Sequence, residues 1–200
     1  MYFCALSFKF TMKELYLRIF ELSQRLIVNP KEFWKQHTEM RENRDDLFRN
    51  LLLPLMAVVA LAVFLGEFFR SDYFRIWVAL LWVLREIVLF ATLFFFGVYG
   101  TEKIIKYSGY PVNIENLQKL VAYSMVPFFI VSAVTGFLPF LKLLDIFGIY
   151  GFYIFMMGGR KLIAVPRENR EPVFLKIIAA NWIVFGVISF FLAKLLTTLD

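Results

Sequence analysis

Five long apolar stretches, separated by short polar segments, dominate this chain. They lie at about 51–69, 74–98, 119–138, 141–157 and 174–193. A hydrocarbon core of roughly 30 Å requires about 20 mostly apolar residues in a helix, and only helices or closed barrels satisfy their own backbone hydrogen bonds inside lipid. The sequence therefore predicts an all-α polytopic integral membrane protein, in which an N-terminal cytoplasmic helical arm (1–48) precedes a bundle of five transmembrane helices (49–200).

Basic residues are distributed unequally between the two sides of this predicted bundle. Seventeen lysines and arginines fall on the side of the N-terminal arm and four on the other, while Arg85 lies inside the second stretch. Because cytoplasmic segments of membrane proteins are enriched in Lys and Arg, we expect the arm to face the cytoplasm and the C-terminus the opposite side. The same asymmetry explains the net charge of +6 without a nucleic-acid partner.

The arm contains the periodicity of an amphipathic helix between Met12 and Val28. Apolar residues recur there at intervals of three and four, which is typical of one helix face: Leu15, Tyr16, Ile19, Leu22 and Leu26. This face could lie in the membrane interface, pack on cytoplasmic loops of the same protein, or bind a partner. Residues 1–11 are unusual in composition, and we interpret them as an extension ahead of an alternative start at Met12.

A second helix of the arm is predicted to begin at Asn29. Asn29 is a favourable N-cap, Pro30 suits the first helical position, and an acidic residue follows three positions after the cap. Phe33 and Trp34 come next, and we expect them to anchor the arm at the level of the lipid headgroups. The polar run at 37–46 is expected to be exposed to solvent.

Charged residues inside the apolar stretches need an explanation, because each costs about 2.5–3.5 kcal/mol on insertion scales. Arg85 and Glu86 lie near the middle of the second stretch. Neighbours on a helix point about 100° apart, so we expect Arg85 to reach towards Glu67 or Asp145 rather than pair with Glu86. Glu86 would then face inward, towards polar residues of the third and fifth stretches: Tyr123, Ser124 and Asn181.

Two interpretations of these intramembrane polar residues remain open. They could form pairs that fix how the helices pack, since lipid gives no hydrophobic drive for helix association. Alternatively, they could line a path for a proton, an ion or a lipid headgroup. Pro127 is expected to kink the third helix. The small-residue pairs Ala62/Gly66 and Ser132/Gly136 predict close helix contacts, within the bundle or in a dimer.

The residue inventory argues against an enzyme. The single histidine, His37, lies in the arm, and the single cysteine, Cys4, excludes an internal disulfide. The sequence contains neither a zinc-binding H-E-x-x-H motif nor a glycine-rich phosphate loop. A metal site would have to combine Glu67, Glu86 and Asp145, and their spacing does not support one. We therefore predict no catalytic residues, no cofactor and no metal.

Several motifs together resemble a known family. They are RLIVNPKEFWKQ at 25–36, LVAYSMVPFF at 120–129 and GIYGFYIFMMGGRKL at 148–162, followed by Val165-Pro166. Their order and spacing resemble the Yip family of Ypt/Rab-interacting membrane proteins, specifically its compact prokaryotic-type members, over about residues 12–196. This resemblance implies a multi-span membrane protein with a cytosolic N-terminal region and no established enzyme activity. Eukaryotic relatives bind small GTPases and other membrane-traffic proteins.

The chain departs from the eukaryotic pattern in its arm. The acidic-leucine-tyrosine-glycine-proline motif of those relatives has no counterpart before Leu51, so GTPase binding is not carried over, and we expect a bacterial plasma membrane. Two functions are predicted. The first is a non-enzymatic protein that organises the membrane or recruits a protein partner through its arm. The second is a small transporter or lipid-handling protein that uses the intramembrane polar residues. The sequence leaves the partner and the oligomeric state open.

Overall fold

The computed structural model describes residues 12–38, 42–71 and 73–197. Residues 1–11, which the sequence suggested to be an extension, lie outside this range. The described part is helical and contains no strand, which confirms the all-α prediction.

The arm and the first span supply the first six elements in chain order. These are α1 (Met12–Val28), α2 (Pro30–His37), α3 (Arg44–Leu47), η1 (Phe48–Leu52), α4 (Leu53–Gly66) and η2 (Glu67–Phe69). The remaining spans follow as α5 (Ile76–Tyr107), α6 (Ile114–Ser124), α7 (Val126–Phe137), η3 (Pro139–Ile149), α8 (Tyr150–Leu162) and α9 (Arg167–Thr197).

Among the residues that the structure describes, five helical segments are long and apolar enough to cross a membrane, as the sequence predicted. They are Arg44–Phe69, Ile76–Tyr107, Ile114–Phe137, Pro139–Leu162 and Arg167–Lys194. Most of them extend past the predicted limits, because polar turns continue the helices beyond their apolar centres. The chain is thus an integral membrane protein.

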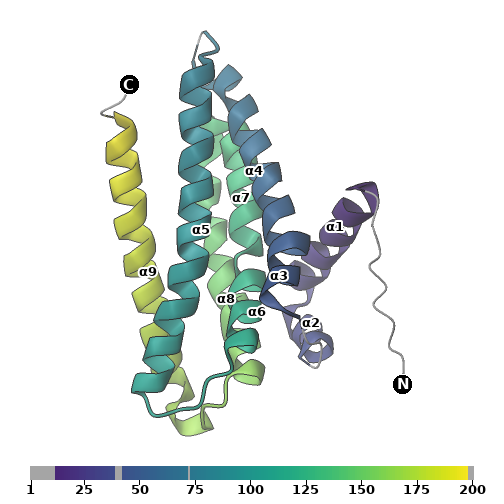
Figure 1. The fold of residues 1–200 in the computed structure, drawn as a ribbon, viewed down its shortest axis with the longest axis vertical. Helices are drawn as coiled ribbons and strands as arrows, with labels where there is room; N and C mark the ends of the chain where they lie inside the picture. Colours follow the sequence, from purple (N-terminus) through teal and green to yellow (C-terminus); the bar gives the residue numbers. More distant parts are fainter. Residues whose placement is uncertain (1–11, 39–41, 72, 198–200) are drawn as a thin grey trace.

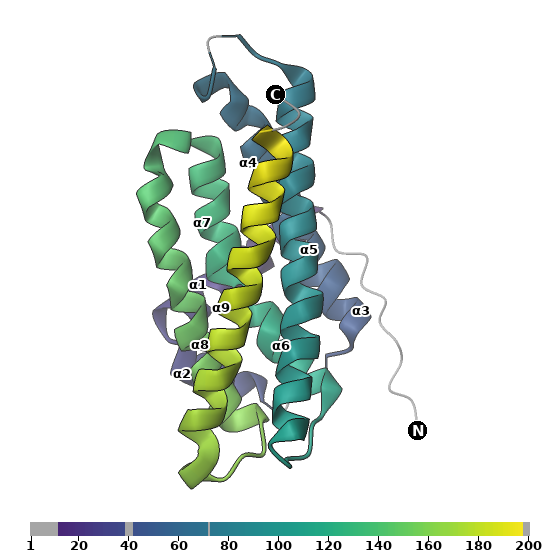
Figure 2. The same cartoon turned by 90° about the vertical axis from the view of Figure 1, so that its left-hand side faces the viewer.

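The spanning helices run side by side along the long axis of the molecule (Figure 1). α4 packs against α5 and α7, α5 also packs against α9, and α6 packs against α8. The view in Figure 2 shows α9 in front, between α5 and the pair formed by α7 and α8. We call the end of the bundle that contacts α1 and α2 the arm end. The opposite end, with η2 and the turn between α7 and η3, is the distal end.

The third span is divided into α6 and α7. The break is at Met125, whose N–H contacts the carbonyl oxygens of Val121 and Ala122 at 3.1 and 3.3 Å. Pro127 lies in the first turn of α7, where its missing N–H is tolerated.

The fourth span does not form the uniform helix that the sequence suggested over 141–157. Its first half is the tighter helix η3, with a non-helical residue at Leu141, and only its second half, α8, is regular. Such long 3-10 segments are uncommon because their hydrogen bonds are poorer. Gly148 and Gly151 lie against the Phe128 ring, where added Cβ atoms would come within 2.9 and 2.6 Å.

The arm forms its two helices, α1 and α2, where the sequence predicts them, and it packs on the bundle. Asn29 caps α2 by accepting a hydrogen bond from the Glu32 N–H (3.2 Å). Ile19 and Leu26 are buried in the same core as the spans, while three other residues of the predicted face are half-buried: Leu15, Tyr16 and Leu22. Of the alternatives for this face, the structure shows packing on the protein itself. Tyr150 of α8 also donates a hydrogen bond to the Ile27 carbonyl (2.9 Å).

Candidate functional site

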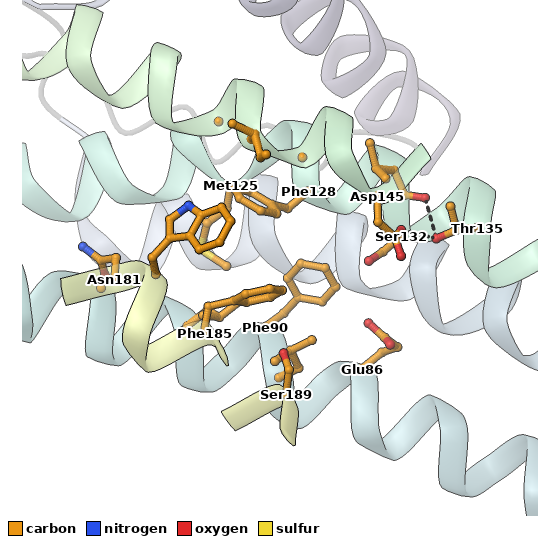
Figure 3. A pocket seen from close by; sticks show the side chains of 18 of the residues that line it. Glu86, Phe90, Met125, Phe128, Ser132, Thr135, Asp145, Asn181, Phe185 and Ser189 are labelled. Carbon is orange, nitrogen blue, oxygen red and sulfur yellow. Dashed lines mark hydrogen bonds between the residues drawn. The ribbon is translucent and has the colours of Figure 1, made fainter. Parts of the chain in front are cut away.

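A cavity of about 820 Å³ lies between the spanning helices. Residues of all five spans line it, and its volume is at the upper end of the roughly 300–1,000 Å³ typical of ligand pockets. Its central wall is aromatic and apolar, with Phe90, Phe128, Phe185 and Met125. Figure 3 shows these side chains between Asn181 on one side and Glu86 on the other. The cavity therefore has an apolar body with polar groups towards its ends.

One end of the cavity is charged. Arg85, Glu86, Lys142 and Asp145 all line it, and Thr135 Oγ1 donates a hydrogen bond to Asp145 (2.9 Å). Glu86 comes from α5, whereas Asp145 comes from η3 and faces it across the cavity (Figure 3). This end is close to the distal end of the bundle, because Thr135 precedes the last residue of α7 by only two positions.

The expectation that Arg85 and Glu86 do not pair is wrong. The Arg85 guanidinium donates a hydrogen bond to Glu86 Oε1, because two long side chains on adjacent helix positions can bend towards each other across an angle of about 100°. The two residues lie in the half of α5 nearer the distal end, because α5 continues past the apolar stretch to Tyr107. Arg85 follows the first residue of α5, Ile76, by nine positions, or about 14 Å along the axis.

Glu67 is occupied by other partners. It is fully buried, and its carboxylate lies 3.4 Å from Arg70 Nη1 and 3.9 Å from Arg75 Nε. Ser71 Oγ also donates to it (3.2 Å). Burial lowers the pKa of Arg70, and the negative charge of Glu67 opposes that change. Glu67 therefore pairs with Arg70, which also lines the cavity, and with Arg75, and it is not the partner of Arg85.

The other predicted polar residues divide between two places. Ser124 and Asn181 line the cavity, and each hydrogen-bonds a carbonyl of its own chain one turn earlier, at 2.7 Å to Leu120 and 2.9 Å to Ile177. Tyr123 points instead to the arm, where its hydroxyl donates to Glu42 (2.9 Å). The structure thus brings Glu86, Asp145, Ser124 and Asn181 to one cavity and excludes Tyr123 from it.

Trp34 attaches the arm to the bundle. Its side chain is fully buried, and its Nε1 donates a hydrogen bond to the Ile154 carbonyl of α8 (3.1 Å). Gly158 makes room for the indole, because a Cβ atom there would come within 2.4 Å of the ring. Phe33 is buried too, at 5.1 Å between ring centroids from Tyr123. The predicted headgroup anchoring of Phe33 and Trp34 is therefore wrong, since both belong to the protein core.

A polar cluster that the sequence did not reveal supports this attachment. Lys119 of α6 is buried and donates to the His37 carbonyl oxygen. Its Nζ also lies 3.9 Å from Glu42. His37 stacks on Phe33 (3.9 Å between centroids), and its Nδ1 donates to the Phe33 carbonyl (2.9 Å). Burial lowers the pKa of His37. The polar run at 37–46, which we expect from sequence to be exposed, is exposed at 43–46 but half-buried at His37 and Glu42.

Comparison with known families places these elements in one domain. The Yip1 domain matches residues 25–193, from the end of α1 to near the end of α9. The chain belongs to the Yip1 domain family. The match includes both the Trp34 attachment and the cavity, and it confirms the resemblance found in the motifs. No curated protein and no solved structure matches the chain.

The Yip1 domain leaves some polar atoms of the cavity wall without partners. Among the side chains that the structure describes, Arg85 Nε, Glu86 Oε2 and Ser189 Oγ are buried and make no hydrogen bond. Buried polar atoms are usually paired, so such exceptions need an explanation. Within the same residues, no group of three His, Cys, Asp or Glu is arranged to hold a metal ion. These three atoms thus leave hydrogen-bonding capacity unused on the wall of the cavity.

Proposed function

We propose that this Yip1-domain protein is a non-enzymatic membrane protein that organises the cytoplasmic surface of its membrane and recruits a partner there through α1 and α2. The observation that carries the proposal is that α1 has two apolar strips, one buried and one exposed. Ile19 and Leu26 are buried against the bundle, whereas Leu17, Phe20 and Val28 are 53%, 68% and 75% exposed. A helix held on a membrane-spanning body with a second apolar strip facing outward fits the interface of a bilayer.

The orientation supports this role. The excess of Lys and Arg on the arm side favours a cytoplasmic arm and a C-terminus on the opposite side. The absence of the eukaryotic arm motif favours a bacterial plasma membrane. The exposed charge of Arg18 on α1 would then face the cytoplasm, where a protein partner can reach it.

Photo-crosslinking in native cells tests the proposal. A photoreactive residue at Phe20 should give lipid adducts, and one at Arg18 should give one discrete protein adduct, because these two positions point about 160° apart on α1. The Arg18 adduct should disappear when Trp34→Ala releases the arm. Tyr73, which is 83% exposed at the distal end, serves as the control position. If the same proteins are captured from Arg18 and Tyr73, the recruiting role is wrong.

The cavity favours a second candidate function, lipid handling. Its apolar body and its charged end match the two parts of an amphiphile, and its residues come from every span. A scaffold that only fixes an arm needs no internal space, whereas protein interiors are normally close-packed. Purification in mild detergent followed by native mass spectrometry tests this function. A copurified lipid that is lost when Ser189→Phe narrows the cavity would support it, and a lipid-free chain would contradict it.

A further inference from the structure

We propose that the cavity binds one phospholipid whose zwitterionic headgroup contains a primary ammonium group, as in phosphatidylethanolamine. The headgroup lies at the charged end, formed by Arg85, Glu86, Lys142 and Asp145, and one acyl chain extends along the apolar wall. This inference rests on the second proposed function, lipid handling, and identifies the lipid class.

The charge balance of the cavity selects a zwitterion. Two cationic and two anionic side chains line the charged end. A fifth charged residue of the wall, Arg70, pairs with Glu67 (3.4 Å), which also lies 3.9 Å from Arg75. The four residues of the charged end therefore carry no net charge, with both signs present. A net anionic headgroup would meet two carboxylates, Glu86 and Asp145, at a depth where charges are weakly screened.

The unused hydrogen-bonding capacity selects a primary ammonium group. Arg85 Nε is a donor without a partner and Glu86 Oε2 an acceptor without one, so the ligand must offer an acceptor and a donor together. A phosphate supplies the acceptor for Arg85 and for Lys142. Ionised carboxylates only accept hydrogen bonds, so Glu86 and Asp145 require N–H or O–H groups. An ethanolamine ammonium has three N–H groups, whereas a choline group has none.

The rest of the cavity suits an acyl chain. Beyond the charged end its wall is formed by apolar and aromatic side chains, including Phe90, Phe128 and Phe185. Asp145 and Ile146 line the cavity and are exposed. The charged end is therefore open beside η3, close to the distal end of the bundle, where a lipid of the distal leaflet would enter.

Competition between headgroups tests the proposal. The full chain is purified, delipidated by detergent exchange and mixed with equal amounts of phosphatidylethanolamine, phosphatidylcholine and phosphatidylglycerol that have identical acyl chains. Native mass spectrometry then measures which lipid stays bound. We expect phosphatidylethanolamine to be retained about tenfold over each of the others, or about 1.4 kcal/mol in free energy.

Substitutions of exposed residues at the mouth of the cavity test the headgroup assignment without unfolding the protein. Lys142 and Asp145 are exposed, so K142Q and D145N should leave the bundle intact while they bring the three lipids close to equal retention. E86Q should do the same where it folds. The matched control is E102Q, which changes a carboxylate on the same helix whose partner is Lys106 (2.5 Å) and should keep the preference.

Different results contradict the headgroup assignment and the lipid-handling function on which it rests. Equal retention of the three lipids by the unchanged chain, or a preference for phosphatidylglycerol, overturns the headgroup assignment and leaves lipid binding in place. Failure of every lipid to bind, or retention that Ser189→Phe does not reduce, overturns the lipid-handling function as well.

Discussion

Gly66 of α4 lies directly against the backbone of Gly136 in α7. A Cβ atom on Gly66 would come within 1.8 Å of the Gly136 carbonyl oxygen, and one on Gly136 within 2.5 Å of the Val63 side chain. The glycines of the two small-residue pairs seen in the sequence thus meet each other inside one chain. Close backbone approach of this kind supports helix association in lipid, where van der Waals packing replaces the hydrophobic drive.

Gly66→Ala should destabilise the bundle strongly. The added methyl group cannot avoid the Gly136 backbone, so α4 and α7 must separate, at a cost of about 3 kcal/mol or more. The free energy of unfolding in mixed detergent micelles measures the effect. Gly100→Ala is the matched control, because nothing lies within 4 Å of its added Cβ. Equal stability of the two variants would show that the α4–α7 contact is looser than described.

Trp34→Ala should release the arm from the bundle. The change removes a fully buried indole and its hydrogen bond to Ile154, with an expected cost of about 3–5 kcal/mol. Limited proteolysis between α2 and α3 should become much faster, while the spans stay intact. Trp77→Ala should have no such effect, because Trp77 is 77% exposed. Unchanged proteolysis of the Trp34 variant would contradict the attachment.

Arg85 and Glu86 should behave as a coupled pair. Removing one partner of a buried ion pair leaves an uncompensated charge and costs about 3–5 kcal/mol. Arg85→Met and Glu86→Leu should therefore each destabilise the protein, whereas the double variant should be less destabilised than the sum of both. The free energies of unfolding of the unchanged chain, the two single variants and the double variant give the coupling energy between Arg85 and Glu86. Additive effects would mean that the two residues act independently.

Arm docking should weaken in mild acid. Burial holds the pKa of His37 below its ordinary value of 6.5, so a released arm binds the proton more readily than a docked one. Docking is then fully stable above about pH 6.5 and becomes less stable as the pH falls towards the lowered pKa. The protection of the amides of residues 30–37 from hydrogen exchange, taken relative to unstructured amides at the same pH, measures this when pH 7.5 and pH 5.5 are compared. His37→Gln, which removes the chain's single histidine, should abolish the difference.

Local features were predictable because they depend on neighbouring residues. The five spans follow from apolar content over about 20 residues, and the start of α2 follows from Asn29 and Pro30. Glu86 and Asp145 could be selected as unusual by their cost inside a membrane. Their partners could not be selected, because pairing depends on which helix faces which. Glu42 and Lys119 were missed for the same reason, since they are far apart in sequence and resemble ordinary surface charges.

The sequence by itself determined that the chain has five segments long and apolar enough to cross a membrane, where the second helix of its arm begins, and that its arm is amphipathic. Hydropathy, capping and periodicity act over a few turns, so they need no tertiary information. Only the tertiary structure decided that Trp34 is buried against α8, that Arg85 pairs with Glu86, and that five helices leave a cavity between them. Those outcomes depend on how side chains from distant segments fit together in three dimensions, which no local pattern records.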